Sequence, residues 1–318
     1  MHSYLDFENA VADLEGKIRE LRTIDERGEA GGEDVEEAIR KLEKRVGETL
    51  RQLYSALTPW QKAQVARHED RPHCVHYVDA LFTDFTPLAG DRKFAEDHAV
   101  ITGFARFKGN PVAVIGQEKG SDTKTRLKHN FGMARPEGYR KAVRVMEMAN
   151  RFGIPVVSLV DTTGAYPGVG AEERGQAEAI ARSTEACLAL NVPNVSVIIG
   201  EGGSGGAIAI AVANRVYMLE HAIYSVISPE GAASILWHDS SRAKDAATNM
   251  KITAQDLLSL KIIDGIISEP VGGAHRDTAD TIRRTGNTIE NALSDLAKSN
   301  ADHRAHRREK FLAMGRSL

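Results

Sequence analysis

Cysteine, aromatic residues and long apolar runs are scarce in this 318-residue sequence. The two cysteines, Cys74 and Cys187, stand far apart and form no CxxC pair, which argues against a disulfide framework or a metal site within this chain. We expect both to be buried, reduced thiols. Aromatic residues make up 6% of the chain, so the core should consist mainly of Ala, Val, Ile and Leu.

The sequence also lacks the features of exported and membrane proteins. It contains no run of 18 or more apolar residues, so we expect no helix that spans a bilayer. The first ten residues, MHSYLDFENA, are too acidic and polar for a signal peptide. The net charge of −3 gives no global field that would attract nucleic acid or a membrane. We therefore expect a cytoplasmic protein.

Two N-terminal stretches carry apolar residues at steps of three and four. These residues are Phe7, Val11, Leu14, Ile18 and Leu21, then Val35, Ile39, Leu42, Val46 and Leu53. A charged, glycine-containing segment, ERGEAGGED, separates the two stretches. The pattern predicts an antiparallel helical hairpin over residues 1–57, with Glu36–Arg40 and Glu37–Lys41 pairs on its exposed face. Its apolar seam must rest on the main domain or on a partner.

Residues 58–98 are interrupted by Pro59, Pro72 and Pro87, so we expect an irregular connector. AVITGFARF and NPVAVIG then predict a β-hairpin that turns at Lys108-Gly109-Asn110.

A weak repeat follows within residues 99–273. NPVAVIGQEKG, IPVVSLVDTTG and VPNVSVIIGEGGSGG each combine a proline, an apolar strand and a polar loop with glycine, and predicted helices alternate with them. This alternation predicts an α/β core with a parallel sheet covered by helices. Residues 274–318 are polar and should form C-terminal helices.

The segment GEGGSGGAIAI, residues 200–210, raises the main functional question, and three interpretations fit it. As a dinucleotide site, Gly200, Gly202 and Gly205 fit G-x-G-x-x-G, and Glu220 lies twenty positions on. The predicted helix of about nine residues is too short for that interpretation. As a serine hydrolase, Gly202-Gly203-Ser204-Gly205-Gly206 fits G-x-S-x-G, with Asp264 and His275 in triad order. However, no strand precedes His275, and an elbow does not need five glycines.

In the third interpretation, the backbone itself is the functional group. A helix N-terminus offers free N–H donors, and glycine lets a ligand oxygen reach them. Such donors stabilise an oxyanion. The structural alternative is close packing of helix on strand without a ligand. A second strand ends in a similar loop, with Asp161, Gly164, Gly168 and Gly170, so the two loops should converge at one edge of the sheet.

Long motifs in this sequence resemble those of the alpha subunit of bacterial acetyl-CoA carboxylase carboxyltransferase. The matching segments are RHEDRP (67–72), AGDRKFAED (89–97), NFGMARPEGYRKA (130–142), DTTGAYPG (161–168), AEERGQAEAIA (171–181), GEGGSGGAIAI (200–210), SVISPEGAASILW (225–237) and EPVGGAHRD (269–277). The sequence departs from the family pattern at Thr163, where proline is usual, and at Pro87-Leu88-Ala89. The first change could loosen the glycine loop.

This resemblance implies a crotonase-like fold of stacked ββα units. It implies transfer of a carboxyl group from carboxybiotin to acetyl-CoA, giving malonyl-CoA for fatty acid synthesis. The biotin is covalently held on a separate biotin carboxyl carrier protein, and ATP is used by a separate biotin carboxylase. The implied assembly is α2β2, with a zinc ribbon on the beta subunit and the active site between alpha and beta. The alpha chain alone should be inactive.

Carried over by motif position, the N–H groups of Gly206 and Ala207 should meet the biotin oxygen, with Gly205 in support. Gly164 and Ala165 should form the neighbouring wall, beside Gly202 and Gly203.

Residues 119–151 hold nine Lys or Arg and three Asp or Glu. Lys124, Arg126 and Lys128 could contact CoA phosphates or the carrier, or they could belong to a solvated face. A non-enzymatic alternative for the whole chain is an assembly scaffold of the same complex.

Overall fold

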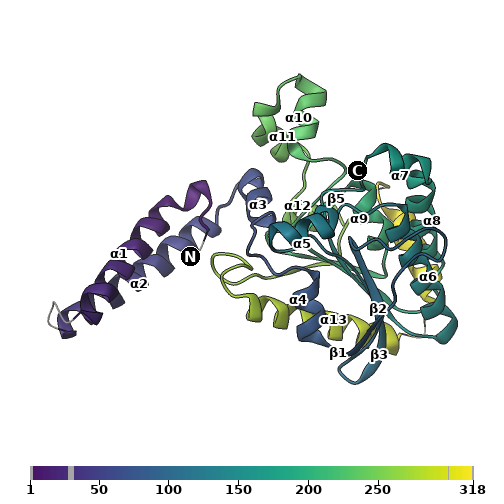
Figure 1. Cartoon of the computed structure of the whole chain (residues 1–318), viewed down its shortest axis with the longest axis horizontal. Helices are drawn as coiled ribbons and strands as arrows, with labels where there is room; N and C mark the ends of the chain where they lie inside the picture. The colour runs from purple at the N-terminus through teal and green to yellow at the C-terminus, as the bar shows by residue number, and fades with distance from the viewer. Residues whose placement is uncertain (1–2, 28–31, 300, 317–318) are drawn as a thin grey trace.

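A mixed eight-stranded sheet forms the centre of the molecule, seen here in a computed structural model that describes residues 3–27, 32–299 and 301–316 (Figure 1). The strands run in the order β1-β2-β3-β4-β5-β6-β8, and β7 pairs with β5. Their bounds are β1 Phe82–Pro87, β2 Val100–Phe107, β3 Asn110–Gln117, β4 Val156–Thr162, β5 Asn194–Gly203, β6 Arg215–Leu219, β7 Ile223–Ser225 and β8 Gly265–Ile267. The β1–β2 and β2–β3 pairs are antiparallel, and all other pairs are parallel.

Helices cover both faces of this sheet, with α6 and α8 on one side and α4 and α13 on the other (Figure 1). The longer helices of the body are α6 Pro136–Phe152, α8 Gln176–Ala189, α13 Thr278–Lys298 and α14 His303–Ala313. The shorter ones are α3 Pro59–Ala66, α4 Cys74–Leu81, α5 Thr123–Lys128, α7 Val169–Glu173, α9 Ser204–Ala211, α10 Pro229–Trp237, α11 Ala243–Asn249 and α12 Ala254–Ser259. Three 3-10 turns complete the chain, η1 Asp6–Glu8, η2 Asn130–Gly132 and η3 Ser240–Arg242.

The central parallel strands agree with the sequence pattern. Every residue of β4 and β5 is buried, as continuous apolar runs between two helix layers predict. The predicted β-hairpin is confirmed, because β2 and β3 pair from Phe107 opposite Asn110 onward. Because β3, β4 and β5 run parallel, their carboxyl ends lie at the same edge of the sheet.

The N-terminal helices α1, Asn9–Glu26, and α2, Gly32–Tyr54, form a hairpin that projects from the body (Figure 1). Its base packs on α3 through a buried cluster that includes Val11, Leu50 and Val65. Two i,i+4 ion pairs form as predicted, Glu36–Arg40 at 3.8 Å and Glu37–Lys41 at 2.7 Å. The loop predicted for ERGEAGGED is shorter than expected, because α1 includes Glu26 and α2 begins at Gly32, and residues 28–31 lie outside the described residues.

The prediction of an irregular connector at 58–98 is wrong. This segment forms α3, α4 and the edge strand β1. Pro59 does not interrupt structure but occupies the first turn of α3, where a proline loses no hydrogen bond. Thr58 caps that helix by accepting a hydrogen bond from the Gln61 N–H. The division of the chain into four units at residues 57, 98 and 273 stays a prediction.

Both cysteines are buried and free, as predicted. Within the described ranges, no helix combines the length and the apolar character that crossing a membrane requires.

Candidate active site

The loops that follow β4 and β5 meet backbone to backbone, as the sequence predicted. A Cβ atom on Gly206 would lie 2.7 Å from the nitrogen of Ala165 and from the carbonyl carbon of Gly164. A Cβ atom on Gly203 would overlap the carbonyl of Thr163. Only glycine allows this approach, so Gly203 and Gly206 have a packing role in addition to any role in ligand binding. Thr162 holds the other loop, since its Oγ1 accepts from the Gly164 N–H at 3.0 Å.

Helix α9 begins directly after β5 and directs its N-terminus at this junction. Its N-cap is Gly203, so the four N–H groups without a helical acceptor are those of Gly203 through Gly206. Ala207 is the next residue, and its N–H donates within the helix. Ser204 adopts a left-handed backbone with φ 53°, which makes the turn from strand to helix sharp.

A cavity of about 620 Å³ opens beside this helix end. Of the residues predicted from the sequence, Gly164, Ala165 and Gly205 line it, together with exposed Ser204. The other predicted residues, Gly202, Gly203, Gly206 and Ala207, are buried behind that lining. The structure therefore brings the two loops together, with one layer of the predicted residues facing the cavity.

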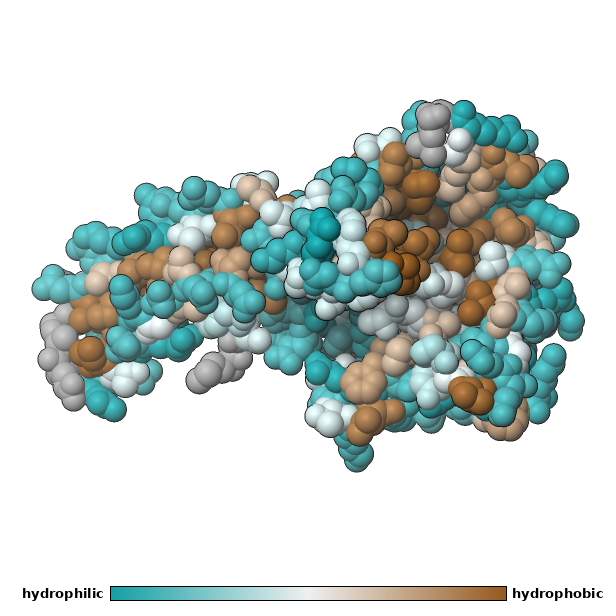
Figure 2. Space-filling model, turned by 90° about the horizontal axis from the view of Figure 1, so that it is seen from above, coloured by the Kyte–Doolittle hydropathy of each residue, from teal (hydrophilic) through white to brown (hydrophobic). Residues whose placement is uncertain are grey.

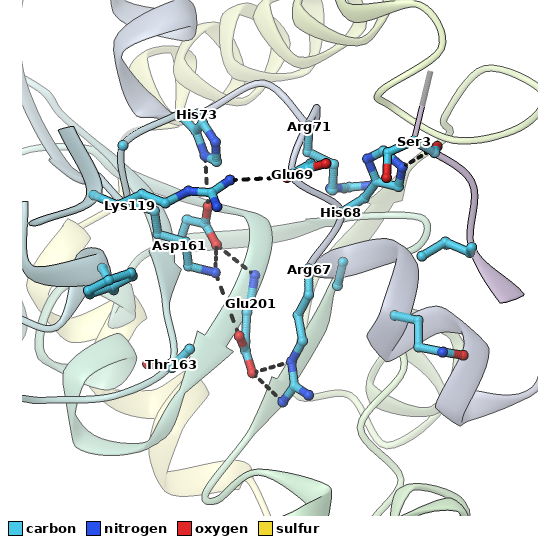
Figure 3. Close-up of a pocket in the computed structure, with 16 residues that line it drawn as sticks. Ser3, Arg67, His68, Glu69, Arg71, His73, Lys119, Asp161, Thr163 and Glu201 are labelled. Atoms are coloured by element: carbon cyan, nitrogen blue, oxygen red, sulfur yellow. Dashed lines mark hydrogen bonds and ion pairs between the residues drawn. The ribbon is translucent and has the colours of Figure 1, made fainter. Parts of the chain in front are cut away.

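A cluster of charged side chains forms the floor between the two loops, and sequence reasoning missed it (Figure 3). Asp161 is the penultimate residue of β4. Its Oδ1 accepts from the Glu201 N–H at 2.9 Å and pairs with Lys119 at 2.7 Å. Burial alone would raise the pKa of Asp161, but Lys119, His73 and the Glu201 N–H outweigh it and hold the pKa below its ordinary value. Glu201 lies two residues before the end of β5 and pairs with Arg67 at 2.7 Å. The sequence held one sign of this cluster, because Asp161 and Glu201 each come at the carboxyl end of an apolar strand.

A second cavity of about 630 Å³ adjoins the first, and Arg67, Thr163 and Glu201 line both. Phe131 lies at its edge with 46% of its surface exposed. Its backbone has φ 55°, and Asn130 and Gly132 on either side also have positive φ. The left-handed backbone is strained at Phe131, whereas Gly132 adopts it without steric cost.

The three basic residues predicted as a contact surface have different surroundings in the structure. Lys124, Arg126 and Lys128 all lie on α5. Arg126 lines the second cavity and lies 3.7 Å from Glu69. Lys124 and Lys128 are exposed.

The serine hydrolase interpretation is wrong, because its three residues lie in different surroundings. Asp264 accepts a hydrogen bond from the Val216 N–H at 2.7 Å and pairs with Lys310. The His275 ring stacks on His68 with ring centres 3.8 Å apart. Ser204 faces the first cavity.

The dinucleotide interpretation also fails in the structure. Helix α9 has eight residues, too few to cross the sheet as a dinucleotide-binding helix does. Glu220 accepts a hydrogen bond from the Glu269 N–H at 3.0 Å, so it serves the fold.

Other motif segments pair with one another within the body. Arg71 of RHEDRP forms a bidentate ion pair with Glu269 of EPVGGAHRD, at 2.8 and 2.9 Å. Arg140 of the PEGYRKA segment pairs with Asp91 of AGDRKFAED at 2.8 Å and with Glu137 at 3.0 Å. These residues stabilise the body that carries the site.

Comparison with known proteins decides the family. A family model described as "Acetyl co-enzyme A carboxylase carboxyltransferase-like" matches residues 4–315. The chain belongs to this carboxyltransferase family. Among curated relatives, the acetyl-coenzyme A carboxylase carboxyl transferase subunit alpha of Chelativorans sp. (strain BNC1) is 75% identical over the full length of both chains. That of Mesorhizobium japonicum is 71% identical, again over both full chains.

Solved structures agree with the fold of this family. Transcarboxylase 12S with methylmalonyl-coenzyme A aligns with a TM-score of 0.58 and 21% identity, over 71% of this chain and 41% of that chain. A chain of a Pseudomonas malonate decarboxylase hetero-tetramer in complex with coenzyme A aligns with a TM-score of 0.56 and 16% identity, over 66% of this chain and 84% of that chain. The fold is therefore crotonase-like, as predicted, and the chain is a carboxyltransferase subunit of the alpha type.

Proposed function

We propose that this chain forms the biotin-binding half of an acetyl-CoA carboxyltransferase that makes malonyl-CoA. The observation that carries the proposal is the N-terminus of α9, where N–H groups without helical acceptors lie against the Gly164–Ala165 loop at the wall of a cavity. Bound there, carboxybiotin on its carrier protein would supply the carboxyl group.

The first cavity suits the ureido ring of biotin in size and chemistry. A cavity of about 620 Å³ lies in the usual range for small-ligand sites. Its glycine and alanine walls leave the main chain accessible, and Ile180 and Ile227 add apolar lining. Main-chain N–H donors suit a ring whose oxygen gains negative charge during carboxyl transfer.

In this proposal, the chain's own residues bind and orient. The N–H groups of Gly205, which lines the cavity, and of Gly206, buried directly behind it, would donate to the oxygen, and Gly164 and Ala165 fix the position of α9. Ala207, whose N–H donates within the helix, contributes packing rather than the second donor that motif position assigned to it. Gly202 and Gly203 let β5 approach the neighbouring loop. Rigid main-chain donors need no reorganisation when charge develops.

Exposed apolar side chains beside the first cavity support a partner that completes the site. Ile208, Val226, Ile235 and Leu236 have between 41% and 81% of their surface exposed, and Val226 lines the cavity. Figure 2 shows apolar side chains gathered on the face of the body that carries α10. Such a surface is typical of a protein interface. We propose the beta subunit as its partner.

The wider assembly follows the family pattern as part of the same proposal. Two alpha and two beta chains would form α2β2, with a zinc ribbon on beta and the acetyl-CoA thioester held across the subunit boundary. A biotin carboxyl carrier protein would deliver the biotin, a separate biotin carboxylase would use ATP to load it, and the complex would act in the cytoplasm.

Reconstitution tests the proposal. The purified chain is mixed with its beta subunit and biotinylated carrier, and carboxyl transfer is measured in reverse as decarboxylation of malonyl-CoA. Activity should require both subunits, because neither alone orients both substrates. Malonyl-CoA turnover by the chain without beta would overturn the shared site. Full activity of a Gly206→Val assembly would instead favour the scaffold alternative.

A further inference from the structure

One arginine joins the two walls of the first cavity. The Nε and Nη2 atoms of Arg67 donate to Glu201 Oε1 at 3.0 and 2.7 Å, and its Nη1 donates to Glu230 Oε1 at 2.7 Å. Glu201 immediately precedes the glycine loop at the end of β5, and Glu230 is the second residue of α10. All three residues line the cavity. Arg67 itself comes from the end of α3, so three distant segments meet at one guanidinium.

For the glycine loop, residues 202–206, Arg67 supplies a side-chain anchor in addition to main-chain contacts. Residues 202–206 include four glycines and no large side chain, so their main chain is held by main-chain contacts. Gly202 pairs with β4 and, like Gly203, with β7, and Gly206 packs on Gly164. The upstream end of the loop is held at two points. The Glu201 N–H donates to Asp161, which Lys119 holds from the other side, and the Glu201 carboxylate is held by Arg67.

We propose that Arg67 is a positioning residue for carboxyl transfer, which sets the glycine loop relative to α10. This role rests on the proposed biotin site, since it acts through the N–H donors of α9. A planar guanidinium can bind two carboxylates in fixed directions, whereas a lysine ammonium presents a single point charge. Arg67 therefore fixes both the distance and the angle between the two walls.

Arg140 provides a matched control for the ion pair itself. It also joins two carboxylates, Asp91 at 2.8 Å and Glu137 at 3.0 Å, and it is similarly inaccessible, with 14% of its side chain exposed against 28% for Arg67. It lines neither of the two cavities. Removing Arg140 should therefore change stability without moving the glycine loop.

The test compares Arg67→Gln, Arg67→Lys and Arg140→Gln chains, each assembled with beta subunit and carrier. Arg67→Gln should lower kcat by about tenfold to a hundredfold, the scale expected when a site is misplaced by a fraction of an ångström to an ångström. The KM for malonyl-CoA should stay unchanged, and Arg67→Lys should recover only part of the rate. Added guanidinium chloride at millimolar concentration should partly restore Arg67→Gln.

A second measurement does not depend on activity. Hydrogen exchange of peptides covering residues 200–212 should be faster in Arg67→Gln than in wild type and unchanged in Arg140→Gln.

Three results would overturn the positioning role. They are an unchanged kcat in Arg67→Gln, equal losses in the Arg67 and Arg140 variants, and a raised KM with normal kcat, which would make Arg67 a substrate contact. Failure of the proposed function itself is recognised separately, because Gly206→Val would then also retain full activity.

Discussion

The backbone of Gly206 lies directly against the backbone of Gly164, so that no side chain separates α9 from the loop after β4. Main-chain contact therefore sets how closely the α9 donors approach this loop. This contact connects the fold to the proposed chemistry, because it fixes donors that no side chain could replace.

Gly206→Val should abolish most of the activity of the assembled complex. A Cβ atom would lie 2.7 Å from two backbone atoms, so α9 must move away from the loop. We expect a fall in kcat of about two to three orders of magnitude, as for the loss of an oxyanion donor. The assay is malonyl-CoA decarboxylation, with assembly checked by size-exclusion chromatography.

Gly205→Ala is the matched control for folding. The nearest atom to its added Cβ would be Ile180 Cγ2 at 3.4 Å, an ordinary contact. It should therefore assemble with wild-type thermal stability. A Gly206→Val chain that assembles and retains wild-type kcat would show that these glycines serve packing only.

Acid should weaken the fold through His275. This ring is 8% exposed, and burial, followed by nearby His68, Arg71 and Arg276, lowers its pKa to about 2. The unfolded chain therefore binds this proton near pH 6.5 while the folded chain does not, so the contribution is complete above pH 6.5 and is lost as pH falls. At pH 5 the loss is about 2 kcal/mol for such a group.

Urea unfolding from pH 7 to pH 5 measures this effect. His275→Phe keeps a ring against His68 and should reduce the pH dependence, whereas His238→Asn, at an exposed position, should leave it unchanged. An unaltered slope in His275→Phe would assign the acid sensitivity to other groups.

Breaking the Arg71–Glu269 pair should destabilise the body strongly. Arg71 is 3% exposed and the Glu269 side chain is fully buried, and Arg71 outweighs the effect of burial to hold the Glu269 pKa at about 2. Glu269→Gln would leave the Arg71 charge uncompensated, at a cost of about 3–5 kcal/mol in the free energy of unfolding. Chemical denaturation at pH 7 measures it. Glu185→Gln, which removes an exposed partner of Arg182, should have no measurable effect, and equal effects would contradict the prediction.

Reversing the charge of Lys124, Arg126 and Lys128 to Glu should raise the KM for CoA substrate or for carrier, with little change in kcat. The reason is that α5 carries these basic residues beside the second cavity. Steady-state kinetics with each substrate varied in turn decides which one is affected. Reversal of Lys298, Arg304 and Arg308 in the C-terminal helices serves as control. Unchanged kinetics in the α5 variant would show that these residues are part of a solvated surface without a role in binding.

Much of the fold could be predicted from local patterns. Continuous apolar runs identified β4 and β5, and alternation with helices identified the parallel arrangement. The connector could not be predicted in the same way, because Pro59 in a first helical turn resembles a helix breaker unless the cap at Thr58 is recognised.

Part of the site could likewise be predicted from local sequence, and part could not. Each glycine loop is a continuous segment that follows a predicted strand, so the parallel arrangement of the two strands predicted that the loops converge. The charged floor is not contiguous, because Arg67 and Glu201 stand 134 positions apart and nothing local couples them. The choice of donors also depends on the structure, because only the observed N-cap at Gly203 shows which N–H groups have no acceptor within α9. The assignment of the donor pair stays a prediction.

The close approach of Gly203 and Gly206 to the neighbouring loop also limits how this protein can change. Where two side chains meet, a larger residue on one side can be offset by a smaller residue opposite. Where two main chains meet, there is no side chain that a substitution could make smaller. A larger residue at Gly203 or Gly206 therefore cannot be compensated by a second substitution. The exposed residues Ser204 and Thr163 beside them can vary. Efforts to alter specificity should therefore work at the rim of the cavity and leave its glycines in place.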